Sequence, residues 1–148
     1  MVDVGGKPVT RREAVARGEV RMSAGAFSAL AEGRLAKGDA LAVARIAGIQ
    51  AAKRTSEIVP LCHPVPLDSV SVDVELEPEA SAARVTARAT TDARTGVEME
   101  ALTAVAAAGL ALIDMIKAVD PAAVLGDIRV LRKEGGKTGL WVREGEAS

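Results

Sequence analysis

Apolar and polar side chains alternate most regularly between positions 70 and 77, where the apolar residues are Val70, Val72, Val74 and Leu76. A period of two residues is typical of a strand that buries one face. Pro78 and the small residues after it indicate a turn, so residues 83–91 are predicted to return as a second strand. A partial alternation over 9–22 predicts an earlier strand, and short runs at 126–132 and 140–142 predict two later ones.

Three other segments carry the signals of helices. Ser23 is a suitable N-cap for a short helix over 24–32, which Gly33 would end. Asp39 can cap a second helix that runs from residue 40 to about residue 57. The longest helix is predicted over 97–119, where it stops before Pro121.

Apart from the short last strand at 140–142, the predicted order of elements is β-α-α-β-β-α-β. Without the short first helix this order becomes β-α-β-β-α-β, the split βαβ pattern of ferredoxin-like folds. The sequence therefore predicts an α+β, ferredoxin-like fold, in which helices pack on one face of an antiparallel β-sheet. No repeat or linker divides the 148 residues, so residues 1–148 are expected to form a single domain.

Composition narrows the classes of function. With 19 basic and 20 acidic residues, the net charge of −1 provides no basic field for nucleic acid. The single cysteine excludes an intrachain disulfide and a cysteine-rich zinc site, and it fits a reducing compartment. The longest uncharged apolar run, 101–113, is too short to span a bilayer. We expect a cytoplasmic protein without nucleic-acid or membrane partners, and its alanine-rich helices favour an oligomer.

The segment from Ile58 to Leu67 contains the only cysteine and the only histidine of the chain, Cys62 and His63, among three prolines. Proline fixes its own φ and favours extended geometry in the residue before it, so this segment is predicted to be stiff and non-helical. A functional His63 and a structural one are both compatible with this pattern. Because adjacent side chains of an extended segment point in opposite directions, a nucleophile–base pair of Cys62 and His63 is weakly supported.

The long predicted helix carries three charges at helical spacing. Steps of three and four residues place one series along a single face: Glu100, Thr103, Ala107, Leu110, Asp114 and Lys117. Asp114 and Lys117 can touch and act as a unit, or they can form an ordinary surface ion pair. Glu100 lies roughly 21 Å away along the axis, so it can share a site with Asp114 only if a second chain supplies one end. Glu98 and Glu100 also suit the positive end of the helix dipole.

The glycine-rich segment 135–138 (GGKT) lacks the spacing of a nucleotide-binding P-loop and precedes a strand, which excludes that motif. Its backbone amides, beside Lys133 and Lys137, could still hold a phosphate. Lys37 stands in a predicted loop, where a lysine is by itself most simply explained as a solvated side chain.

Four motifs together resemble one known family: residues 44–55 (ARIAGIQAAKRT), 60–64 (PLCHP), 95–105 (TGVEMEALTAV) and 114–118 (DMIKA). Essentially the whole chain is similar to the MoaC family, the cyclic pyranopterin monophosphate synthases of molybdenum cofactor biosynthesis. The chain begins near that family's MVDV motif, which implies that a leader segment is missing or was never present.

The resemblance implies a lyase that acts on a small molecule. The family converts a cyclised dihydro-GTP, made from GTP by a radical-SAM cyclase, into cyclic pyranopterin monophosphate with release of pyrophosphate. The resemblance also implies a ferredoxin-like fold and a homohexamer, a trimer of dimers with its sites at subunit interfaces. No cofactor is firmly implied, although Mg²⁺ could enter with the substrate triphosphate.

The resemblance also implies roles for residues at matching positions. The implied catalytic residues are Asp114, Lys117, Lys37 and His63, with His63 expected to shuttle a proton or orient the substrate. The implied substrate-binding residues are Leu61, Cys62, His63, Met99 and Glu100, with Arg12, Arg94, Glu98 and Lys133 as further pocket residues. Two other classes of function remain open: a non-catalytic pterin- or nucleotide-binding subunit, and a hydrolase of GTP itself, against which the missing P-loop argues.

Overall fold

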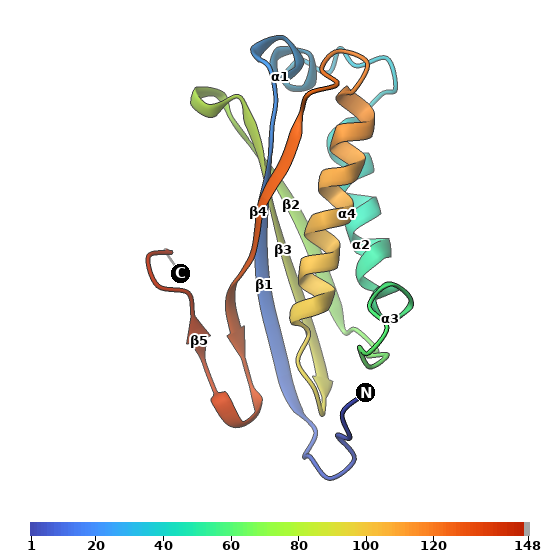
Figure 1. Ribbon diagram of the computed structural model, residues 1–148, viewed down its shortest axis with the longest axis vertical. Coiled ribbons are helices and arrows are strands. Elements are labelled where there is room, and N and C mark those ends of the chain that lie inside the picture. The colour runs from blue at the N-terminus through green and yellow to red at the C-terminus, as the bar shows by residue number, and fades with distance from the viewer. Residues whose placement is uncertain (147–148) are drawn as a thin grey trace.

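A computed structural model describes residues 1–146, so residues 147 and 148 of the expected domain lie outside the described residues. The chain forms one five-stranded sheet with helices packed on it (Figure 1). In chain order the elements are β1 (Thr10–Arg21), α1 (Ala24–Ala31), α2 (Ala40–Ala52), α3 (Thr55–Ile58), β2 (Ser69–Glu77), η1 (Pro78–Ala80), β3 (Ala82–Ala93), α4 (Glu98–Ile116), β4 (Val124–Glu134), η2 (Gly136–Thr138) and β5 (Trp141–Val142).

The strand order confirms the predicted fold class. The sheet runs β2-β3-β1-β4-β5, and every neighbouring pair is antiparallel. Its first four strands have the order of the split βαβ pattern, with β1 between β3 and β4, and β5 extends the edge beside β4. Because β1 is antiparallel to both neighbours, its first residues lie beside the last residues of β3 and β4: Thr10 pairs with Ala93, and Glu13 with Glu134.

Helices α2 and α4 lie side by side on one face of the sheet (Figure 1). Alternate residues of β1 point into the core beneath them, among them Ala14, Ala16 and Val20, which are fully buried. Small residues let the two helices approach closely, because a Cβ at Gly48 of α2 would stand 2.8 Å from the carbonyl oxygen of Ala104 in α4. Core packing therefore fixes α4 firmly relative to the sheet.

Both long helices end earlier than the sequence predicts. The second helix does not reach Glu57, because the hydroxyl of Thr55 donates to the Ala52 carbonyl oxygen at 2.9 Å and a separate short helix, α3, begins there. The longest helix ends at Ile116 rather than Val119. The amides of Val119 and Asp120 both donate to the Ile116 carbonyl oxygen, which closes the helix before Pro121 is reached.

The prediction that Glu100 and Asp114 lie along one face of α4 is also wrong. Glu100 is only 2% exposed, whereas Leu110 is 63% exposed and the Asp114 side chain 53%. A series spaced by 3.5 residues drifts by about 20° per heptad around a helix of 3.6 residues per turn, so Asp114 is rotated away from Glu100. Glu100, near the start of α4, therefore points into the protein, whereas Asp114, near the end of the helix, faces solvent.

By length and apolar composition alone, α4 is a helix that could cross a membrane. Half of it is buried inside the protein, where it supplies fully buried core residues such as Val105, Leu112 and Ile116. This burial identifies α4 as the core helix of the fold.

Candidate active site

The carboxylate of Asp114 lies between two lysines at the end of α4. Lys37 Nζ is 2.6 Å from its Oδ2, and Lys117 Nζ is 2.8 Å from its Oδ1. Hydrogen bonds from Lys117 and Lys37 lower the pKa of Asp114 to about 2. The group therefore presents an ionised carboxylate between two ammonium groups, a combination that can both accept and donate protons.

Local structure holds Lys37 in this position. It lies in the loop between α1 and α2, where the preceding Leu35 is buried and the following Asp39 caps α2 by accepting a hydrogen bond from the Ala42 amide. The loop is thus fixed on both sides of Lys37. Lys37 is a loop lysine with a 46% exposed side chain, and it also forms an ion pair with Asp114, which the sequence by itself did not indicate.

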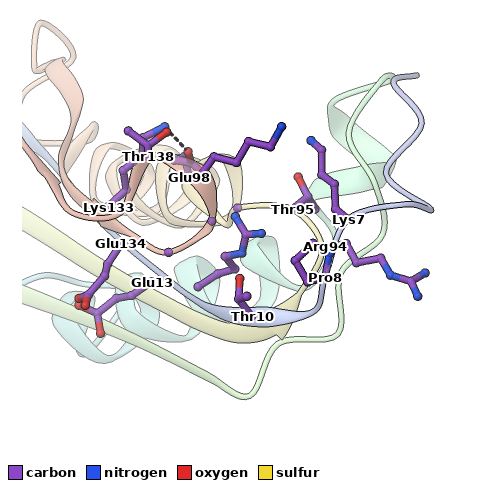
Figure 2. A pocket seen from close by; sticks show the side chains of 15 residues that line it. Lys7, Pro8, Thr10, Glu13, Arg94, Thr95, Glu98, Lys133, Glu134 and Thr138 are labelled. Carbon is purple, nitrogen blue, oxygen red and sulfur yellow. Dashed lines mark hydrogen bonds and ion pairs between the residues drawn. The ribbon is translucent and has the colours of Figure 1, made fainter.

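A cleft of about 430 Å³ lies at the other end of α4, where the helix begins (Figure 2). The topology creates it, because the start of β1, the end of β3, the start of α4 and the end of β4 meet there. Four of the predicted pocket residues therefore converge from distant parts of the chain: Arg12, Arg94, Glu98 and Lys133.

The cleft is rich in positive charge. Five cationic side chains line it against three carboxylates. Lys133 donates to Glu98 at 2.9 Å, the contact drawn dashed in Figure 2. Glu13 binds Arg132 at 2.7 Å, and Figure 2 shows its carboxylate and that of Glu134 pointing away from Lys7. Within residues 1–146, four cleft cations form no ion pair, and they are Lys7, Arg12, Arg94 and Lys137. Such a surplus favours an anion.

Cys62 and Glu100 meet beside this end of α4. The Cys62 thiol donates to Glu100 Oε1 at 3.8 Å, while Oε2 is buried without a hydrogen-bond partner. Burial, and then the charge of Glu100, raise the pKa of the Cys62 thiol, and burial raises the pKa of Glu100. A thiol with a raised pKa is a poor nucleophile, so this pair is better suited to binding than to covalent catalysis.

The proline-rich segment between α3 and β2 is non-helical, as predicted, although Ile58 at its start belongs to α3. It is tied to β3 because the Thr91 hydroxyl donates to the Pro66 carbonyl oxygen and the Asp68 amide donates to that of Thr90. His63 is half-buried within this segment, and Leu61 is 71% exposed. Met99, exposed at the start of α4, adds a second apolar side chain at the same end of the helix.

The structure therefore divides the predicted site residues between the two ends of α4. Lys37, Asp114 and Lys117 gather at one end, and the residues of the cleft and of the Cys62–Glu100 pair gather at the other. From Glu98 to Asp114 the helix rises roughly 24 Å, too far for one small molecule to reach both groups on a single chain.

The sequence alone did not identify all of the cleft. Lys7 and Thr10 precede or open β1, and Thr95 precedes α4, yet all three line the cleft. The segments of Lys7 and Thr10 carry none of the four family motifs, whereas Thr95 opens the motif at 95–105. The signal that could have found them is topological, because the split βαβ order already places the start of β1 beside the end of β4. Among residues 1–146, no group of three or more His, Cys, Asp or Glu residues is placed to hold a metal ion.

Comparison with known proteins finds the MoaC family, which the sequence motifs resemble, along nearly the whole chain. The sequence model of the MoaC family matches residues 1–136. A cyclic pyranopterin monophosphate synthase of Thermomicrobium roseum is 54% identical, over 97% of this chain and 87% of the relative. One from Pelotomaculum thermopropionicum is 52% identical, over 99% and 86%. Cyclic pyranopterin monophosphate synthase 2 of Mycobacterium bovis is 56% identical, over 97% and 84%. The chain belongs to the MoaC family.

Proposed function

We propose that this chain is a cyclic pyranopterin monophosphate synthase of molybdenum cofactor biosynthesis. It is a lyase that rearranges a cyclised dihydro-GTP into cyclic pyranopterin monophosphate and releases pyrophosphate. Its relatives carry that name. The structural observation that carries the proposal is the preassembled group of Lys37, Asp114 and Lys117.

This group would move protons during the rearrangement. The reaction opens and recloses rings, which needs a group that accepts a proton and another that donates one. The carboxylate of Asp114 accepts the proton, and the ammonium group of Lys117 or Lys37 donates one. The Asp114 carboxylate and the two ammonium groups lie within hydrogen-bond distance of one another, so the proton need not pass through bulk water.

The cleft at the start of α4 would hold the phosphates. Departure of pyrophosphate builds up negative charge, which nearby guanidinium and ammonium groups stabilise. Arg12, Arg94 and Lys133 supply such groups, and the cleft volume of about 430 Å³ leaves room for a polyphosphate. Beside the cleft, the exposed Leu61 and Met99 and the polar Cys62–Glu100 pair suit a flat, partly polar ring system, with His63 as the assisting proton carrier.

The complete site would combine two chains. The roughly 24 Å between the two ends of α4 supports this arrangement, because one chain's Asp114 group can then face its partner's cleft. Exposed apolar side chains on the helical layer, Val43 and Ile46 of α2 and Leu110 of α4, are consistent with subunit contact. We propose a homohexamer, a trimer of dimers, with sites at the subunit interfaces.

The remaining assignments rest on the family. We propose one MoaC-like domain over residues 1–148, a cytoplasmic location, and a radical-SAM GTP cyclase as the pathway partner that supplies the substrate. Any Mg²⁺ would enter on the triphosphate, whose oxygens are ligands of the kind that this ion prefers.

The decisive experiment incubates the purified protein with the cyclised dihydro-GTP and follows pyrophosphate and the fluorescent oxidised pterin. Both should appear in equal amounts, and Asp114→Asn should abolish both. Tight binding of the substrate without turnover would instead indicate a non-catalytic binding subunit. Release of phosphate or pyrophosphate from GTP itself would indicate a hydrolase.

A further inference from the structure

Two adjacent glycines form a part of the cleft wall that packs directly against β1. Gly135 and Gly136 have φ values of +106° and +68°, a region that other residues rarely adopt. Neither has space for a side chain. A Cβ at Gly135 would collide with the carbonyl oxygen of Arg11 and stand 3.0 Å from Arg12 Cδ. A Cβ at Gly136 would collide with Arg12 Nη1 and stand 3.0 Å from its Cζ.

Arg12 therefore lies directly against this glycine pair. Its Nε donates to the Ala93 carbonyl oxygen at 3.3 Å, which ties the guanidinium to the end of β3. Its two Nη atoms lie over Gly136, and Arg12 forms no ion pair within residues 1–146. The guanidinium is thus held in one orientation at the cleft wall, with its outer N–H groups available to a ligand.

We propose that Gly135 and Gly136 are positioning residues for Arg12, and that the guanidinium so held is the main contact of this cleft with a diphosphate or longer polyphosphate. The proposal rests on the proposed function in taking this cleft as the phosphate end of the site. It assigns to the glycine pair a task other than phosphate binding through its own amides. The glycines act by leaving space for Arg12.

The other cations of the cleft are less suited to this role. Lys133 is already paired with Glu98 at 2.9 Å, so it attracts a phosphate less strongly than an unpaired cation does. Arg94 is exposed, and no hydrogen bond orients it within residues 1–146. Lys7 lies in a bend and Lys137 in η2, and both carry flexible stems whose ordering opposes binding. A guanidinium that is already oriented can donate two parallel N–H bonds to one phosphate, which a lysine cannot do.

The chain provides a matched control in the same turn. Gly139 has a φ of +66°, nearly the value of Gly136, but a Cβ there would meet nothing within 4 Å. Gly136→Ala and Gly139→Ala each place a side chain at a positive φ and are strained for that reason. Only Gly136→Ala displaces Arg12. A larger loss in Gly136→Ala that disappears in an Arg12→Ala background therefore reports on the guanidinium.

The test measures the affinity of inorganic pyrophosphate for the purified full-length protein by calorimetry, and KM and kcat for the cyclised dihydro-GTP. Gly136→Ala should weaken pyrophosphate binding roughly tenfold or more, the size of a lost charge-assisted hydrogen bond, and raise KM with little change in kcat. Gly139→Ala should remain within about twofold of the wild type, since it loses no such bond. In an Arg12→Ala background, Gly136→Ala should cause no further loss.

Equal affinities of the two alanine variants, additive losses in the Arg12→Ala background, or a wild-type protein that does not bind pyrophosphate would each overturn the proposal. Should both loop variants fail to fold, Arg12→Lys in the unaltered loop tests the same idea. It keeps the charge but loses the oriented fork, so wild-type affinity in Arg12→Lys would also overturn it. Failure of the proposed function appears separately, as a wild-type protein that binds pyrophosphate but does not convert the cyclised dihydro-GTP.

Discussion

Lys37 Nζ contacts Asp114 twice, at 2.6 Å from the carboxylate Oδ2 and at 3.0 Å from the backbone carbonyl oxygen. The loop between α1 and α2 is therefore tied both to the side chain and to the last turn of α4. The second contact places a positive charge at the negative end of the helix dipole. Lys37 thus fixes the orientation of the carboxylate, and Lys117 binds its other oxygen.

Lys117→Ala should abolish product formation while the proposed oligomer stays intact. The substitution removes the donor at 2.8 Å from Asp114 Oδ1, and loss of a general acid–base partner lowers rates by roughly 100-fold or more. Pyrophosphate release measures the rate, and gel filtration checks the assembly. A fully active Lys117→Ala would show that the two residues form only a surface ion pair.

Asp114 should stay ionised down to a pH of about 2. Its folded-state pKa lies below its ordinary value of 3.8, so the stability that it contributes is present above pH 3.8 and is lost as the pH falls through about 2. In Lys117→Ala the carboxyl should titrate at higher pH, because the largest cause of the lowering is gone. Carbon-13 NMR of labelled aspartate carboxyls follows both titrations, and an unchanged midpoint would exclude Lys117 as that cause.

The fold was largely predictable because local signals agree with the tertiary structure. The alternation of apolar residues located β2 within one residue at each end, since this strand buries one face. The ends of α2 and α4 were not predictable. They depend on hydrogen bonds of Thr55 and Val119 that compete with the helix, and such competition is invisible in apolar periodicity.

The site was predictable only in parts. Spacing paired Asp114 with Lys117, and family resemblance added Lys37, but nothing local indicates that Lys37 reaches across to the end of α4. Packing of the whole fold brings Lys37 and Asp114 together although they lie far apart in the sequence. The contact of Arg12 with Gly136 is similar, because it spans the first and the last third of the chain and depends on the β1–β4 register.

His63→Ala should lower turnover of the cyclised dihydro-GTP roughly 100-fold if the imidazole carries a proton. His63→Gln separates that role from orientation, because glutamine can still hydrogen-bond but does not titrate near neutral pH. Low turnover in His63→Gln would support proton transfer, and turnover close to that of the wild type would support orientation. Wild-type turnover in purified His63→Ala would remove both roles.

Glu100→Gln should make the fold more stable at neutral pH. Burial raises the pKa of this carboxyl above 4.5, so the folded state binds more protons than the unfolded state, and wild-type stability falls as the pH rises from 4.5 through the folded-state pKa. Glutamine carries no charge and escapes this loss. Thermal unfolding at pH 4 and pH 7 should show an advantage for Glu100→Gln that is larger at pH 7. An equal difference at both pH values would contradict the raised pKa.

Gly48→Ala should destabilise the protein although alanine favours helices. The added methyl would stand 2.8 Å from the Ala104 carbonyl oxygen and 3.0 Å from Val72 Cγ2, so α2 must move away from α4 and the sheet. Overpacking of this kind costs roughly 1–3 kcal/mol, against a gain of about 1 kcal/mol from helix propensity. We expect a net loss of up to about 2 kcal/mol in urea unfolding, with all variants measured at one protein concentration. Gly25→Ala in α1 is the control. A Cβ there meets nothing within 4 Å, so only the propensity gain should remain, and a Gly48→Ala as stable as Gly25→Ala would show that the helices are free to separate.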